Sequence, residues 1–196
     1  TLITEGKVLV NGSVVTELGT KVKPSDTIEV EGIKLEQQDK LYILFYKPAQ
    51  VITSVSDDRG RKVVTDYFKQ IKTRIYPVGR LDYDTSGLLL LTNDGEFTNL
   101  MTHPSYKIKK KYVVKLKGYL MREEVKALEH GVELEDGHTQ PATVKVKNQD
   151  KDKNSTLVEI TITEGRNRQV RRMFEHFGHE VTKLQRIEVG PLNLKG

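Results

Sequence analysis

From residue 41 onward the chain alternates between segments with the period of a β-strand and segments with the period of an α-helix. Of all the features of the sequence, this alternation constrains the fold most strongly, because strands and helices that follow one another closely must pack on a shared core. Strand patterns lie at residues 41–46, 88–91, 112–116, 143–146, 157–162 and 181–189. Helical patterns lie at residues 63–71, 96–101, 122–129 and 167–177. The sequence therefore predicts the α+β class, with a mixed, mainly antiparallel sheet and helices packed on it. Residues 41–46 read as a buried strand.

Residues 1–36 show a different pattern and predict a separate small β unit. Short apolar runs flank Asn11-Gly12, which is a strong signal for a tight hairpin turn. A segment of this length buries little core. Residues 37–40 are polar and without periodicity, so we interpret them as a linker to a larger domain at residues 41–196.

Composition and missing motifs exclude several classes of protein. The chain has no cysteine, which removes disulfides and thiolate-ligated zinc. No apolar run approaches the roughly 18 residues of a membrane-spanning helix, and no secretory signal opens the chain, so we expect a cytoplasmic protein. Phosphate-loop, dinucleotide-binding and serine-elbow motifs are absent. His176 and His179 are interpreted as helix-end or surface residues, and we expect neither a metal nor an organic cofactor.

Clustered basic residues favour a polyanionic partner. The net charge is +5, with six lysines in residues 107–117 and four arginines in residues 166–172. Acidic residues gather between these runs, at residues 123–136. The pattern predicts one basic face and one neutral or acidic back. Each run alone also fits ordinary solvated surface, but the two together favour binding of nucleic acid.

The segment GRLDYDTSG at residues 79–87 is the densest in polar side chains, and it leads directly into the apolar run at residues 88–91. Loops held by a rigid strand commonly carry function, and this one would position the carboxylates of Asp82 and Asp84. The structural alternative is that both aspartates only satisfy turn amides.

Two further segments offer side chains that could serve such a carboxylate. In EGRNRQVRRM, residues 164–173, an arginine that points inward would keep a neighbouring carboxylate ionised. Alternatively, Asn167 caps a helix whose arginines face solvent. Tyr112 is either a core residue or an aromatic ring that stacks on an extruded base.

Three segments together carry a resemblance: GRLDYDTSGLLLLTND at residues 79–94, Lys110-Lys111-Tyr112, and EGRNRQVRRM. They resemble the ribosomal-RNA pseudouridine synthases of the branch that contains the small-subunit enzyme and the large-subunit enzymes B, E and F. The similarity covers about residues 41–194. Residues 2–33 resemble the second half of the small RNA-binding module named after ribosomal protein S4, so an incomplete module without its first helices is expected.

The resemblance implies roles for individual residues. Asp82 corresponds to the nucleophile, and Arg171 to the arginine that pairs with it. Tyr112 corresponds to the tyrosine that packs on the target uracil, and Val170 to an aliphatic residue of the base pocket. Arg80 corresponds to an arginine beside the nucleophile, near the phosphate of the flipped nucleotide. RNA contacts are further expected from Lys110, Lys111, Arg166, Arg168 and Arg172.

The implied reaction converts uridine to pseudouridine in ribosomal RNA, after the base leaves its helix, with no cofactor. The aspartate could add to the ring, attack the ribose or remove a ribose proton. Residues 102–105 and 173–178 resemble enzyme B, so large-subunit (23S) RNA is the expected partner of a monomer. The alternatives are a small-subunit (16S) enzyme, a non-catalytic RNA-binding or ribosome-assembly protein, and a metal-dependent RNA hydrolase that uses Asp82 and Asp84.

Overall fold

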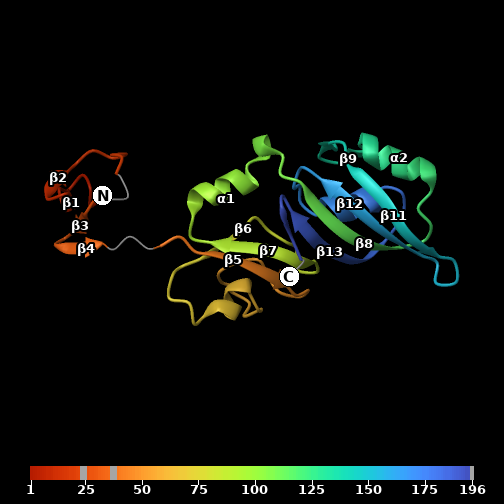
Figure 1. The fold of residues 1–196 in the computed structure, drawn as a ribbon, viewed down its shortest axis with the longest axis horizontal. Coiled ribbons are helices and arrows are strands. Elements are labelled where there is room, and N and C mark those ends of the chain that lie inside the picture. The colour runs from red at the N-terminus through yellow and green to blue at the C-terminus, as the bar shows by residue number, and fades with distance from the viewer. Residues whose placement is uncertain (23–25, 36–38, 195–196) are drawn as a thin grey trace. The chain divides into compact units, whose positions relative to one another are not determined.

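The structure, a computed structural model, describes residues 1–22, 26–35 and 39–194. The chain divides into two compact units, Thr1–Lys40 and Leu41–Gly196, which we describe one at a time (Figure 1). The predicted linker at residues 37–40 lies partly outside the described residues. In the described ranges, no helix has the length and apolar character needed to cross a membrane.

The first unit is a four-stranded antiparallel sheet with the order β2-β1-β3-β4. Its strands are β1 (Val8–Val10), β2 (Ser13–Val15), β3 (Ile28–Val30) and β4 (Ile33–Leu35). The predicted hairpin at Asn11-Gly12 is confirmed, and both residues have the positive φ angles, 52° and 81°, that a tight hairpin turn requires. The side chains described in this unit are at most half-buried, as expected for so short a segment.

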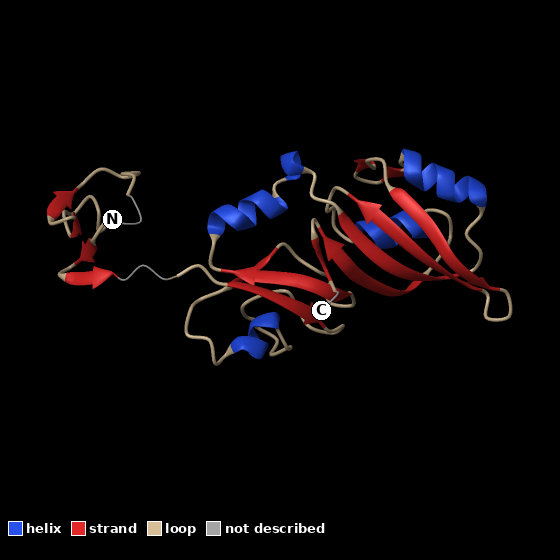
Figure 2. Ribbon diagram, in the orientation of Figure 1, coloured by secondary structure: helices blue, strands red, loops and turns tan. Residues whose placement is uncertain are grey.

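The second unit is built on an eight-stranded sheet with the order β11-β12-β8-β13-β7-β5, to which β14 and β6 add at β13 and β7 (Figure 2). Only β7 and β13 pair in parallel, so the predicted α+β class with a mixed, mainly antiparallel sheet is confirmed. The strands are β5 (Tyr42–Lys47), β6 (Tyr76–Val78), β7 (Ser86–Thr92), β8 (Lys110–Lys117), β11 (Thr143–Asp150), β12 (Ser155–Ile162), β13 (Val181–Val189) and β14 (Leu192–Asn193). A separate two-stranded sheet joins β9 (Glu133–Leu134) to β10 (Gly137–His138).

Three α-helices and two 3-10 helices accompany the sheet in the described residues. They are α1 (Gly95–Thr102), α2 (Arg122–His130), α3 (Gln169–Glu175), η1 (Val64–Phe68) and η2 (Pro104–Tyr106). Two predicted helices are therefore shorter than expected, because residues 63–71 form only η1 and the segment at 167–177 shortens to α3. Residue 168, rather than Asn167, is the N-cap of α3.

The prediction of a buried strand at residues 41–46 is wrong in one respect. Strand β5 lies at the edge of the sheet, where Tyr42, Leu44 and Tyr46 are about half exposed and the alternate residues face inward. A continuous apolar run does not reveal this, because large apolar side chains are common on protein surfaces.

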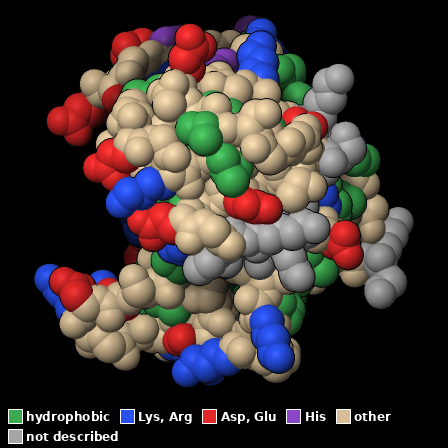
Figure 3. Space-filling view, turned by 90° about the vertical axis from the view of Figure 1, so that its left-hand side faces the viewer, with side chains coloured by type: hydrophobic (Ala, Val, Ile, Leu, Met, Phe, Trp, Pro, Cys, Tyr) green, Lys and Arg blue, Asp and Glu red, His purple; other side chains and the backbone are tan. Residues whose placement is uncertain are grey.

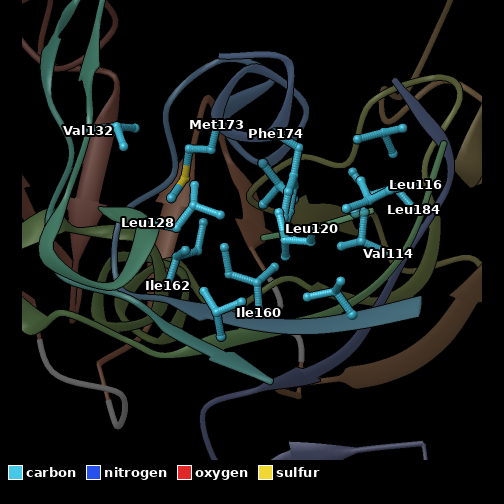
Figure 4. Packing of buried hydrophobic residues seen from close by; sticks show 14 residues of the cluster. Val114, Leu116, Leu120, Leu128, Val132, Ile160, Ile162, Met173, Phe174 and Leu184 are labelled. Carbon is cyan, nitrogen blue, oxygen red and sulfur yellow. The ribbon is translucent and has the colours of Figure 1, made fainter. Parts of the chain in front are cut away.

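The sheet carries two separate apolar cores. One lies between α2, α3 and the strands β8, β11, β12 and β13, with Leu128, Met173 and Phe174 among its helical members (Figure 4). The other lies among β5, β7 and η1 and includes Leu89 and Leu91. Tyr112 packs against both cores, which places it at their boundary.

The two halves of the sheet meet where β7 and β13 pair over only two residue pairs, Gln185↔Ser86 and Arg186↔Gly87. Gly87 has a φ of +119°, and a Cβ built there would overlap the Arg186 carbonyl oxygen and lie 2.6 Å from its backbone nitrogen. A glycine is therefore required at this crossing.

Candidate active site

The Asp82 loop is held by hydrogen bonds on both sides of the aspartate. Before it, Leu81 is buried, and the Thr53 hydroxyl donates to the Leu81 carbonyl oxygen at 2.7 Å and accepts from the Leu81 amide at 3.2 Å. After it, the buried Thr85 donates its amide to the Asp82 carbonyl oxygen at 3.0 Å. Among the described residues no backbone amide donates to the Asp82 carboxylate, so turn formation alone does not account for this side chain.

Two arginines of the α3 segment approach this loop. The Arg168 guanidinium forms a fork on Asp84, with N–O distances of 3.1 and 3.0 Å, and its Nη1 lies 3.8 Å from Asp82 Oδ2. Arg171 is buried, and its Nη2 lies 3.1 Å from the Asp84 carbonyl oxygen and 3.5 Å from Asp84 Oδ1. The implied contact between Arg171 and Asp82 is therefore replaced by contacts to Asp84, while Arg168 is the cation next to Asp82.

This arrangement shapes both the charge and the backbone at the site. The hydrogen bonds from Arg168 hold the pKa of Asp84 below its usual value, and the nearby charge of Arg171 adds to that effect. Arg168 itself has a left-handed backbone with a φ of 49°, which is uncommon for a residue with a long side chain. The strained backbone lies at the residue that links the two aspartates to α3.

A pocket of about 670 Å³ opens between the Asp82 loop, β8, β13 and the start of α3. Its volume lies within the range of roughly 300 to 1,000 Å³ that is typical of small-molecule sites. Seven of the residues predicted for the site line it: Arg80, Asp82, Lys110, Tyr112, Arg166, Arg168 and Val170. Residues that the sequence did not single out also line it, among them Met101, Leu184 and Arg186. Arg186 is buried. The signal that could have pointed to it is its position as a charged residue within the predicted strand at residues 181–189.

Three predicted residues lie outside the pocket wall. Arg171 lies behind it, on Asp84. Lys111 projects to the opposite face of the sheet, where its Nζ is 3.6 Å from Glu188. Arg172 forms a fork on Asp136, with distances of 2.8 and 2.9 Å, and its hydrogen bonds lower the pKa of Asp136 to about 2.

The clustered basic residues do not share one face, contrary to the expectation of one basic face and one neutral or acidic back. Along β8 the side chains alternate, so Lys110 lines the pocket whereas Lys111 and Lys115 project to the other face. Asp136, from the segment expected at the back, pairs with arginines of the pocket region. Figure 3 shows acidic and basic side chains intermixed on the side of the molecule that lies at the left of Figure 1.

Besides Arg171, two further buried titratable residues lie outside the pocket wall. Lys47 is fully buried at the end of β5, where its Nζ donates to the carbonyl oxygens of Pro48 and Val51 at 2.8 and 2.7 Å, and burial lowers its pKa to about 8. His179, predicted at a helix end or on the surface, is buried, and its ring nitrogens contact the Lys117 carbonyl oxygen and Glu124. The described residues contain no group of three or more side chains able to hold a metal ion.

Comparisons with known proteins extend this description. A family model described as RNA pseudouridylate synthase matches residues 41–176, and a model of the S4 domain matches residues 1–28. Ribosomal large subunit pseudouridine synthase B of Bacillus subtilis is 60% identical over 195 residues, which cover 100% of this chain and 80% of that protein. An uncharacterized RNA pseudouridine synthase of Aquifex aeolicus is 45% identical, with 98% and 78% of the two chains covered.

Solved structures show the same fold. A crystal structure of a pseudouridylate synthase superposes with a TM-score of 0.73 at 29% identity, covering 99% of this chain and 82% of that one. The archaeal box H/ACA Nop10-Cbf5 complex matches in fold alone, with a TM-score of 0.58, 17% identity, and 79% and 49% of the two chains covered. The family matches span most of the described chain, and the catalytic unit and the preceding β unit each have their own match. The chain therefore belongs to the RNA pseudouridylate synthase family, as a pseudouridine synthase that carries an S4 domain.

Proposed function

We propose that this pseudouridine synthase modifies uridine in large-subunit (23S) ribosomal RNA, with Asp82 as its nucleophile. One observation carries the proposal: the Asp82 carboxylate opens onto a pocket that is lined by Tyr112 and by several cations. The choice of RNA is supported by a relative, 60% identical over the whole chain, whose name is ribosomal large subunit pseudouridine synthase B. Ribosomes are assembled in the cytoplasm, so the enzyme acts there.

The side chains of the pocket suit the reaction. The bond from uracil N1 to the ribose breaks, the ring turns and C5 bonds to the ribose; the C5 hydrogen then leaves as a proton, and N1 takes up a proton. A carboxylate can begin this sequence by adding to the ring, attacking the ribose or removing a ribose proton. Each route needs a carboxylate held close to the nucleotide, and the fixed loop around Asp82 supplies one. No oxidant and no cofactor enters this balance.

The base must leave its helix before it can enter the pocket. Extrusion costs a few kcal/mol, and stacking and phosphate contacts must offset that cost. Tyr112 is held between the two cores and offers a rigid surface for the uracil, while Val170 and Leu184 form an apolar wall. We propose that the active unit is a monomer.

The cations of the pocket region are suited to the RNA backbone. Arg80, Lys110 and Arg168 line the pocket, and Arg166 is fixed by Glu164 at 2.9 Å. Arg172, which is held by Asp136, lies near these pocket cations and adds a further contact for RNA. Lys111 would contact RNA that reaches the other face of the sheet. Arginines held by carboxylates present their remaining donors in a fixed direction, which suits binding to phosphate.

Tritium release tests the proposal directly. Large-subunit and small-subunit RNA, each labelled with tritium at C5 of uracil, are incubated separately with the enzyme and with the Asp82→Asn variant. We expect release from large-subunit RNA by the wild type only, at one site or a few sites that sequencing of the modified RNA would locate. Release from small-subunit RNA alone would refute the choice of substrate, and equal release by the variant would refute the nucleophile.

A further inference from the structure

A buried arginine of the pocket has no acidic partner. Arg186, on β13, is 6% exposed, and its Nε donates to the Leu88 carbonyl oxygen at 2.9 Å. No carboxylate of the described residues lies within ion-pair distance of it. A guanidinium that is removed from water without a counter-charge is unfavourable, and an anion from outside the chain would compensate it.

Strand pairing directs Arg186 into the catalytic pocket. On β13 it pairs with Tyr112 of β8 on one side and with Gly87 of β7 on the other. Residues paired across neighbouring strands project from the same face, so Arg186 emerges beside the Tyr112 ring. Arg186 therefore lines the same pocket as Asp82.

Lys110 is a second cation of this kind. It lines the pocket, is half-buried, and also has no ion-pair partner among the described residues. Burial lowers its pKa and the charge of Arg186 lowers it further, while the charge of Glu164 raises it to a smaller extent, so Lys110 and Arg186 lie close enough to repel each other. Arg166 and Arg168, which line the same pocket, each form an ion pair with a carboxylate, Arg166 with Glu164 and Arg168 with Asp84. An anion between Lys110 and Arg186 would relieve their repulsion.

We propose that Arg186 and Lys110 form a phosphate subsite of the catalytic pocket, which binds a phosphate group of the RNA strand next to the extruded uridine. The inference rests on the proposed function and names the part of the substrate that this corner of the pocket holds. A nucleotide placed between Asp82 and Tyr112 brings its backbone phosphates with it. Guanidinium and ammonium groups bind phosphate through charge-assisted hydrogen bonds.

Single neutral linkages in the RNA test the subsite. Stem-loop RNAs that contain the target uridine are made with one methylphosphonate, which has no charge, at each linkage near that uridine in turn. For the wild type we expect one linkage at which binding weakens about tenfold, the size of one charge-assisted contact. Arg186→Gln should bind the unmodified RNA about tenfold more weakly and should lose no further affinity at that linkage.

Controls separate this effect from general loss of charge and from misfolding. Lys145→Gln removes an exposed lysine on the opposite face, for which no ion-pair partner lies among the described residues, and should keep the full sensitivity to that linkage. Arg186→Lys keeps the charge and should retain part of the sensitivity, which covers the case in which the glutamine variant fails to fold.

Two outcomes would overturn the subsite. Either the wild type binds every methylphosphonate RNA as tightly as the unmodified RNA, or Arg186→Gln keeps the same sensitivity at the same linkage. Tritium release from the unmodified RNA by the wild type is measured in parallel. A failed reaction is thereby distinguished from a failed subsite.

Discussion

The two halves of the synthase sheet contribute different charged groups to the site. The half that contains β5, β6 and β7 supplies the carboxylates of Asp82 and Asp84 together with Arg80, whereas the half that contains β8 and β13 leads to Arg166, Arg168 and Arg186. Each half has its own apolar core, and β7 and β13 join them through only two residue pairs. The ion pairs of Arg168 and Arg171 with Asp84 therefore cross the boundary. The pocket lies there because the two aspartates and the arginines that hold Asp84 come from different halves.

The backbone crossing at Gly87 is the most sensitive part of this boundary. Gly87→Ala would drive a methyl group into the backbone of Arg186 at a positive φ, so we expect a loss of roughly 3 kcal/mol or more in the free energy of unfolding. Gly95→Ala is the matched control, because a Cβ there meets nothing within 4 Å, and we expect a change within about 1 kcal/mol. Urea unfolding measures both. Equal, small changes would show that the crossing tolerates a side chain.

The ionic contact across the boundary should matter more for rate than for stability. Arg168→Gln removes the fork on Asp84 and the cation 3.8 Å from Asp82, and we expect kcat to fall about 10- to 100-fold through lost positioning. Arg122→Gln, at an exposed position on α2, should leave kcat within about twofold. Single-turnover tritium release measures both rates. A wild-type rate for Arg168→Gln would separate the ion pairs from catalysis.

In the half of the sheet that contains β5, Lys47 makes the free energy of unfolding depend on pH in the alkaline range. Its folded-state pKa of about 8 lies below the ordinary value of 10.5, so between these values the unfolded chain binds a proton that the folded chain does not. Its contribution to stability therefore rises from pH 8 to pH 10.5. We expect urea unfolding to show wild type gaining stability over this range relative to Lys47→Met. A constant difference between the two proteins would contradict the lowered pKa.

In the other half, Asp136 makes the free energy of unfolding depend on pH in the acid range, with a smaller expected effect than that of Lys47. Its folded-state pKa of about 2 lies below the ordinary 3.8, so its contribution to stability is complete above pH 3.8 and is lost as the pH falls toward 2. Urea midpoints of wild type and Asp136→Asn should therefore differ more at pH 5 than at pH 2.5. A difference that is the same at both pH values would show that the Arg172 fork contributes nothing measurable.

Local patterns predicted the features that depend on neighbouring residues. Turn chemistry predicted the hairpin at Asn11-Gly12, and apolar periodicity predicted the fold class. The same reasoning missed features set by strand register. Lys110 and Lys111 are adjacent in sequence but lie on opposite faces, and Arg186 enters the pocket only because β13 pairs with both β7 and β8. The resemblance implied a pair of Asp82 with Arg171 but did not predict that Arg171 contacts Asp84.

The matched pair Asp82→Asn and Asp84→Asn tests the central claim most directly, with single-turnover release of tritium from C5-labelled large-subunit RNA as the measurement. Asp84 is held by two arginines and positions the loop, whereas Asp82 opens onto the pocket. We expect no release above background for Asp82→Asn and slowed but measurable release for Asp84→Asn. Release by Asp82→Asn at the wild-type rate, or activity that depends on Asp84 alone, would contradict the assignment of Asp82 as the nucleophile.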